Sequence, residues 1–124
     1  MDSEVKPKRE NVVRDKSFAF AIRVVRLCRH LQETKREFVL TKQLLRSGTA
    51  VGALVREAEH AESRADFVHK MAIALKEANE TDYWLDLLFQ TELLDKQGFQ
   101  SIQPDAVELI KLLTSIIKSS KGKS

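Results

Sequence analysis

The stretch that decides the fold is "LLRSGTAVGALVREA", residues 44–58, in which two glycines lie four residues apart among aliphatic side chains. Apolar residues recur through it at alternating steps of four and three, as they do on one face of a helix. A loop at Gly48 would break this register, yet Val51 continues the stripe that Leu44 begins. We therefore predict that Gly48 and Gly52 lie inside a helix, where the missing side chains let a neighbouring backbone approach closely.

Glycines at this spacing also occur in phosphate-binding loops. Such a loop follows a strand and ends in Gly-Lys-Ser or Gly-Lys-Thr, and residues 44–58 have neither feature. Each helical glycine costs roughly 1 kcal/mol relative to alanine, so tight packing must offset that cost. The close-packing interpretation is therefore favoured over the phosphate loop.

The composition bounds the class of protein. At 124 residues the chain is one domain, and with two prolines and many Ala, Leu, Glu, Lys and Arg residues its composition is helical. A single cysteine, Cys28, excludes an intrachain disulfide and a cysteine-based metal cage. The first residues lack the apolar segment of a secretion signal, and no run reaches the roughly 18 apolar residues of a membrane span. We expect a cytoplasmic protein that is not bound to a membrane.

Apolar periodicity predicts four helices in an antiparallel, up-down-up-down four-helix bundle, an all-α fold without cofactor. The predicted helices cover about 17–33, 37–62, 64–95 and 104–118, within a bundle domain at 17–118. Residues 1–16 are predicted to be a mobile charged arm, with a possible start of helix near Asn11, and 119–124 a frayed basic tail. In the first helix, Phe18, Ile22, Val25 and Cys28 are predicted to form an apolar stripe wide enough for burial on more than one side, because it is flanked by Phe20, Val24, Leu27 and Leu31.

Four residues are predicted to mark helix ends. Ser63 can cap the third helix, with Asp66 reaching back as the second half of a capping box. Gly98 is typical of a helix stop, and Pro104 suits the first turn of the fourth helix.

Two segments carry a family resemblance. "RSGTAVGALVREA" followed by "SRADFVHKMAIALKEANETDYWLDLL" resembles the signature of the four-helix-bundle proteins known as 23S ribosomal RNA intervening-sequence proteins, and "KSFAFAIRVVRL" at 16–27 fits their usual opening. The resemblance implies an antiparallel bundle, pentameric rings and no catalytic residue. It extends to the accessory proteins of diversity-generating retroelements, which bind nucleic acid and a reverse transcriptase through a basic surface. Leu54 stands where the family usually has Asn, so no role of that amide carries over, and we expect Leu54 in the core.

The charge is unevenly distributed. The chain has a formal net charge of +3, but residues 17–37 hold five basic and two acidic side chains, while 63–97 hold four and seven. The candidates for binding nucleic acid lie along the first helix and are Arg23, Arg26, Arg29 and His30. The alternative is that these side chains pair with acids on another helix or subunit, such as Glu77, Glu80, Asp82 and Asp86.

The third helix is predicted to have a core stripe at alternating steps of four and three, made of Phe67, Met71, Ala74, Ala78, Thr81, Leu85 and Leu88. It also carries apolar residues outside this stripe. Ile73, Trp84 and Leu87 lie roughly on a common flank, and a small bundle cannot bury every side of a helix. Because interfaces are enriched in Trp, and because the resemblance implies rings, these three residues are candidates for a homo-oligomer interface. Packing against a second helix of the same bundle is the alternative.

Acid-to-histidine steps raise the possibility of a metal enzyme. Glu57 and His60, and Asp66 and His69, have the spacing used by di-iron bundle proteins. They crowd around one turn and lie off the core stripe, so we predict no metal site. The sequence thus favours a non-enzymatic, self-assembling scaffold whose basic surface engages RNA, DNA or a nucleic-acid enzyme; a protein–protein adaptor without nucleic acid remains open.

Overall fold

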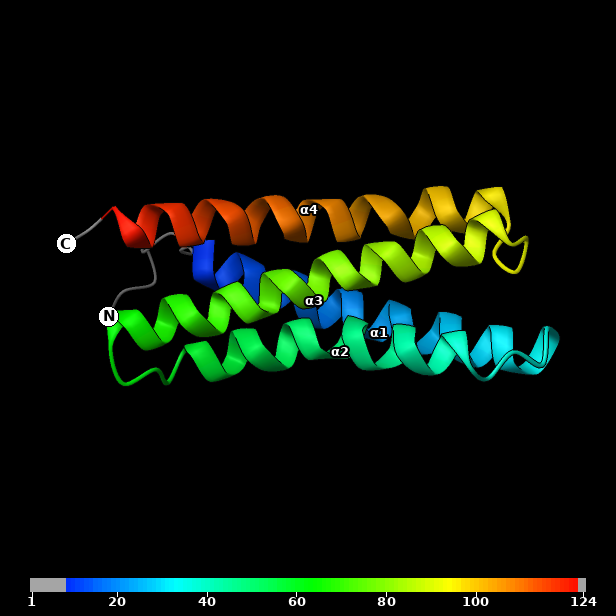
Figure 1. Ribbon diagram of the computed structural model, residues 1–124, viewed down its shortest axis with the longest axis horizontal. Coiled ribbons are helices and arrows are strands. Elements are labelled where there is room, and N and C mark those ends of the chain that lie inside the picture. Colours follow the sequence, from blue (N-terminus) through cyan, green and yellow to red (C-terminus); the bar gives the residue numbers. More distant parts are fainter. Residues whose placement is uncertain (1–8, 123–124) are drawn as a thin grey trace, which may run out of the picture.

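The computed structural model describes residues 9–122. They form four helices, α1 (Arg9–Thr34), α2 (Leu40–Ala58), α3 (Arg64–Gln90) and α4 (Lys96–Lys121), each running antiparallel to the one before (Figure 1). Helices that follow one another pack side by side, and α4 returns to α1, so α1 and α3 occupy diagonal corners. The prediction of an antiparallel four-helix bundle is confirmed. No helix within residues 9–122 is long and apolar enough to cross a bilayer.

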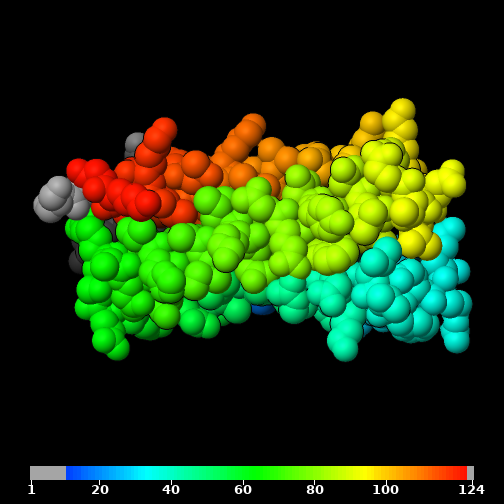
Figure 2. Space-filling view, in the orientation of Figure 1, coloured from blue at the N-terminus to red at the C-terminus, as the bar shows by residue number. Residues whose placement is uncertain are grey.

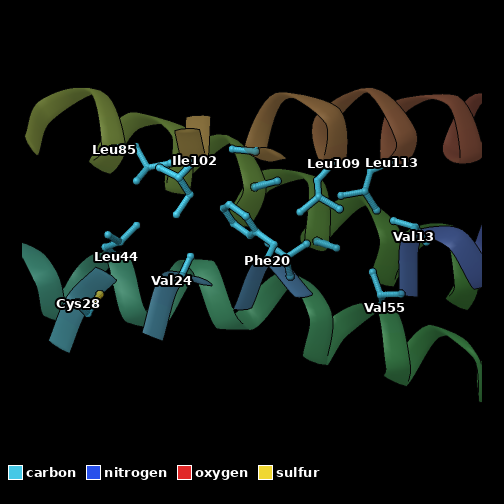
Figure 3. Packing of buried hydrophobic residues seen from close by; sticks show 14 of the residues in the cluster. Val13, Phe20, Val24, Cys28, Leu44, Val55, Leu85, Ile102, Leu109 and Leu113 are labelled. Atoms are coloured by element: carbon cyan, nitrogen blue, oxygen red, sulfur yellow. The ribbon is translucent and has the colours of Figure 1, made fainter. Parts of the chain in front are cut away.

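One continuous core runs along the bundle. Phe20 and Val24 of α1 point into it between side chains of the other helices, such as Leu44 of α2 and Leu109 of α4 (Figure 3). In α3 the buried residues follow the predicted four-three stripe, and they are Met71, Ala74, Ala78, Thr81, Leu85 and Leu88. Because each helix presents one such stripe to the centre, four helices enclose a core without a sheet.

Glycines bring α1 and α2 close together. Gly48 and Gly52 lie inside α2 and are buried. A Cβ on Gly48 would lie 2.8 Å from Val24 Cγ1, and a Cβ on Gly52 would lie 3.3 Å from the backbone oxygen of Ser17. Residues of α1 therefore occupy the space that side chains at positions 48 and 52 would need.

The first helix begins earlier than predicted. The predicted arm at 1–16 is wrong for residues 9–16, because α1 begins at Arg9 and Val13 is fully buried; residues 1–8 lie outside the described part of the chain. The predicted stripe of α1 is also displaced, since Phe18 and Ile22 are 53% and 38% exposed. Arg9–Thr34 instead buries Val13, Ser17, Phe20, Val24, Cys28 and Leu31.

The caps of α2 and α3 differ in kind. The start of α2, expected near residue 37, is at Leu40, and the carboxylate of Glu37 caps it by accepting hydrogen bonds from the backbone N–H groups of Leu40 and Thr41 at 3.0 and 2.9 Å. The end of α2, expected at 62, is at Ala58. At α3 the predicted cap is confirmed, because Ser63 Oγ accepts from the Asp66 N–H at 3.1 Å.

The boundary between α3 and α4 was wrongly predicted. Helix α3 ends at Gln90, where Glu92 adopts a left-handed conformation with φ 67° and the N–H of Leu93 donates to the carbonyl of Leu88. This is the hydrogen-bond pattern of a Schellman motif with Glu in the usual glycine position. Gly98 is not a stop but lies in the first turn of α4, where its N–H donates to Asp95 Oδ1 at 2.7 Å.

Helix α4 is longer at both ends than expected. It begins at Lys96, so Pro104 lies in its interior instead of its first turn. A proline there has no N–H for the carbonyl of Gln100, four residues earlier. The helix also continues to Lys121, into the segment predicted to fray from residue 119, and residues 123–124 lie outside the described part.

Candidate nucleic-acid interface

The four cationic candidates on α1 do not share one environment. Arg23 is bound to α4: its Nη1 lies 2.6 Å from Asp105 Oδ2 and donates to the carbonyl of Ser101 at 3.0 Å, and its Nη2 donates to Ser101 Oγ. These contacts link α1 to the turn of α4 in which Pro104 lacks a backbone N–H group. Arg23 is therefore a partly neutralised link between helices instead of a free cation.

The other three candidates are exposed. The side chains of Arg26, Arg29 and His30 form no ion pair or hydrogen bond with another residue of the described range 9–122. Their polar groups are therefore available to solvent and to ligands. They lie on the side of α1 that faces away from α3, because α1 buries its opposite side in the core.

A groove between α1 and α4 collects part of this charge. One hollow of about 300 Å³ is lined by Arg23, Arg26 and Leu27 of α1 and by residues of the first turns of α4. A second, of about 450 Å³, shares Leu27 and adds His30 and Lys35. Arg23 and Arg26 of α1, and Lys35 just after α1, thus place three cations along this wall.

The far end of the same groove is acidic. Glu92 and Asp95, from the connection between α3 and α4, line the larger hollow opposite His30 and Lys35. Arg29 lines neither hollow. The unpaired cations that a phosphate backbone could meet along the groove are therefore Arg26 and Lys35, and the exposed imidazole of His30 lies between them as a possible hydrogen-bond partner.

The acids proposed as partners of the α1 arginines have other partners. Arg46 of α2 bridges Glu77 at 3.1 Å and Glu80 of α3. The indole N–H of Trp84 donates to the carboxylate of Glu80 at 2.9 Å, and together with Arg46 it lowers the pKa of that carboxyl. These contacts link α2 to α3 and leave Arg26 and Arg29 uncompensated.

The other two acids proposed as partners, Asp82 and Asp86, accept hydrogen bonds from side-chain amides. Asp82 Oδ1 accepts from the side chain of Gln103 at 3.2 Å, and Asp86 Oδ1 accepts from Gln90 at 3.2 Å. Within the described residues neither carboxylate forms an ion pair. The α3 surface therefore carries net negative charge.

The acid-to-histidine pairs do not converge on a metal position. Lys70 Nζ lies 3.8 Å from Glu57 Oε1 and 3.8 Å from Asp66 Oδ1, between the two carboxylates. His60 and His69 are exposed. Among residues 9–122 no three His, Cys, Asp or Glu side chains come close enough to hold a metal ion together.

The lone thiol is not a nucleophile. Burial, together with the negative charge of Glu37, raises the pKa of Cys28 to about 12. Its Sγ donates to the carbonyl of Thr41 at 3.4 Å, inside the core. Cys28 therefore stays protonated at neutral pH.

The candidate interface residues of α3 are half-buried. Trp84 packs against the core, and its ring meets that of Tyr83 edge to face at 5.0 Å. Leu87 is partly exposed one turn after it, Ile73 is partly exposed about three turns before it, and Leu54, expected in the core, is half-buried on α2. The most exposed aromatic residue of α3 is Tyr83, at 58%, which the sequence analysis did not select.

The exposure of Tyr83 and that of Phe18 were not predicted, for different reasons. Tyr83 lies between Asp82 and Trp84, outside the core register, and its exposure follows from that register. Phe18 was assigned to the core because α1 is apolar on two sides. Only the position of α2 selects the side that is buried.

These features define a class: an all-α four-helix bundle with ion pairs between its helices and exposed basic side chains on α1. A match in sequence identifies the family. Residues 9–115 match the family model of the 23S rRNA-intervening sequence protein, and the chain belongs to that family.

A solved structure supports the fold. A crystal structure of a protein with unknown function from the S23 ribosomal protein family of Bacteroides thetaiotaomicron is 56% identical in sequence, with a TM-score of 0.88. The match covers 90% of this chain and 99% of that one. No curated protein matches the chain.

Proposed function

We propose that this chain is a non-enzymatic, cytoplasmic scaffold that assembles with itself and binds nucleic acid, or a nucleic-acid enzyme, through the α1 side of the groove. The observation that carries the proposal is that the exposed cations Arg26 and Lys35 have no ion-pair partner in residues 9–122 and line the groove together with the exposed imidazole of His30. Cations so placed gain free energy by releasing counterions from a phosphate backbone. The resemblance to accessory proteins of diversity-generating retroelements favours the same class of partner.

Self-assembly would strengthen weak contacts. A net charge of +3 is small for a nucleic-acid-binding domain. An oligomer repeats the cationic wall once in each subunit, so several weak contacts act together if one strand reaches them all. A pentamer is the number that the family resemblance suggests.

The test compares two double variants with equal change of charge. Arg26→Glu with Lys35→Glu removes cations of the groove, whereas Lys111→Glu with Lys118→Glu removes exposed cations of α4. Binding of fluorescently labelled single-stranded RNA, and of a DNA duplex, is measured by anisotropy at low and at high salt. We expect the groove variant to bind roughly tenfold more weakly at low salt, with a salt slope shallower by about 1 to 2.

Equal losses in both variants would contradict a site in the groove. Absence of any salt-dependent binding by the wild-type chain would favour the protein–protein adaptor. Arg23 is left unchanged in this test, because its link to Asp105 and Ser101 would confuse loss of charge with loss of packing.

A further inference from the structure

Exposed aromatic side chains lie on two helices that do not touch. Phe18 and Ile22 of α1 are 53% and 38% exposed, and Tyr83 of α3 is 58% exposed. Because α1 and α3 occupy diagonal corners, these side chains belong to different surfaces of the bundle. Figure 2 looks onto the α3 side, from which hardly any of α1 is visible.

The first surface, which we name the α1 patch, is apolar and positively charged. Phe18, Ile22, Val25 and Arg29 follow one another at steps of four, three and four along one side of α1. Arg56 of α2 extends this side, with its guanidinium carbon 5.1 Å from the centre of the Phe18 ring. Neither Arg29 nor Arg56 forms an ion pair with another residue in 9–122.

The second surface, which we name the α3 patch, is apolar and negatively charged. Tyr83, Asp86 and Leu87 lie on neighbouring turns of the outer side of α3, beside the half-buried Trp84. The Asp86 carboxylate accepts only from the amide of Gln90. A surface with exposed aromatic rings and an uncompensated carboxylate matches the aromatic and arginine groups of the α1 patch.

We infer that the α1 patch of one copy of this chain binds the α3 patch of another, an inference that rests on the proposed self-assembly. The opposite charges of the two patches favour a second copy of this chain as the partner, because each copy carries one positive and one negative patch. Arginine and aromatic residues are the types enriched at the centres of interfaces. Since the two surfaces differ, the contact is head-to-tail, and each added copy leaves one patch free for the next until a ring closes.

The test uses one variant for each patch. Ile22→Glu with Arg29→Glu alters the α1 patch, and Tyr83→Ala with Asp86→Arg alters the α3 patch. All four side chains are exposed, so both variants should fold, which circular dichroism checks. Lys111→Glu with Lys118→Glu is the control, and the mass in solution is measured by light scattering after gel filtration.

We expect the wild-type chain and the control to have masses that are multiples of 14.2 kDa, and each patch variant alone to be a monomer. Mixing the two variants is the decisive step. One still has an intact α3 patch and the other an intact α1 patch, so the mixture should form a dimer with one copy of each and nothing larger.

Three results would overturn the inference. A patch variant that keeps the wild-type mass shows that its patch is not at the interface. Monomers in the mixture, when each variant alone has also lost assembly, show that the two patches do not bind each other. A monomeric wild-type chain would overturn the inference and the proposed self-assembly together, whereas the first two results leave self-assembly standing.

Discussion

Replacement of Gly48 by alanine tests the contact between α1 and α2. An added Cβ would lie 2.8 and 2.9 Å from the two γ carbons of Val24 and 3.2 Å from its Cβ. Carbon atoms in proteins pack at about 3.5 to 4.0 Å, so all three contacts are too short. Rotation of the Val24 side chain would not relieve the contact with its Cβ, and Val24 is fully buried. The helices must therefore move apart or the core must rearrange.

Two opposing effects set the magnitude. Alanine favours the helix over glycine by about 1 kcal/mol. Overpacking of a core costs about 1 to 3 kcal/mol, and the two contacts shorter than 3.0 Å place Gly48→Ala near the upper end. We expect a net loss of about 2 kcal/mol in the free energy of unfolding, or roughly 6 to 10 °C in Tm. Urea and thermal unfolding followed by circular dichroism measure both.

Two further variants separate packing from helix propensity. Gly122 lies at the end of α4, where an added Cβ would meet no atom closer than 3.6 Å, so Gly122→Ala should change stability by less than about 0.5 kcal/mol. Val24→Ala removes both methyl groups that the new Cβ of Gly48→Ala would strike. The double variant should then be more stable than the sum of the two single losses predicts, by about 1 kcal/mol or more. A gain in stability from Gly48→Ala alone, or additive losses in the double variant, would refute this account of the packing.

Three other predictions follow from the caps and from the thiol. Glu92 has a left-handed conformation with φ 67°, which glycine adopts without strain. Glycine loses more chain entropy on folding, which offsets part of this relief, so we expect Glu92→Gly to raise the free energy of unfolding, measured in urea, by a net amount of about 0.5 to 1 kcal/mol. A lower free energy of unfolding would show that the Glu92 side chain is needed. Burial would raise the pKa of Glu37, but N–H donors at the start of α2 outweigh it and hold the pKa below its ordinary 4.5. The stabilisation from Glu37 is therefore present above pH 4.5 and is lost as the pH falls through the lower folded-state pKa. On acidification through this range the wild type should lose more stability than Glu37→Gln. Parallel profiles of stability against pH for the two proteins would contradict this. Cys28, with its pKa raised from 9.0 to about 12, should react with iodoacetamide at mildly alkaline pH about 1,000-fold more slowly in the native than in the urea-unfolded protein; similar rates would show that the thiol is accessible.

Local patterns predicted the features that depend on neighbours in sequence. The buried stripe of α3 and the cap at Ser63 were predicted, because both are set within one or two helical turns. The end of α3 was not, because Glu92 takes the place where glycine is the usual marker. The start of α4 was misplaced for a related reason, since Pro104 is tolerated in a helix interior where sequence patterns predict a first turn.

The candidate basic surface was predicted only in outline. The sequence indicated that α1 is rich in arginine, but not that Arg23 would reach Asp105, 82 residues away, while Arg26 stays free. A side chain of that length can pair with any carboxylate on a neighbouring helix. Which one it meets depends on the register between α1 and α4.

The sequence by itself determined that this chain is helical, where most helical turns lie, and that two glycines permit a close helix contact, because propensity and periodicity act over a few residues. The tertiary structure alone decided which side of α1 is buried. Phe18 and Phe20 are equally apolar, and Phe20 is inside because Gly48 and Gly52 admit α1 only with Val24 and Ser17 turned toward α2. The same contact leaves Phe18 and Ile22 outside, since a helix packed along one side cannot bury the other without a further partner.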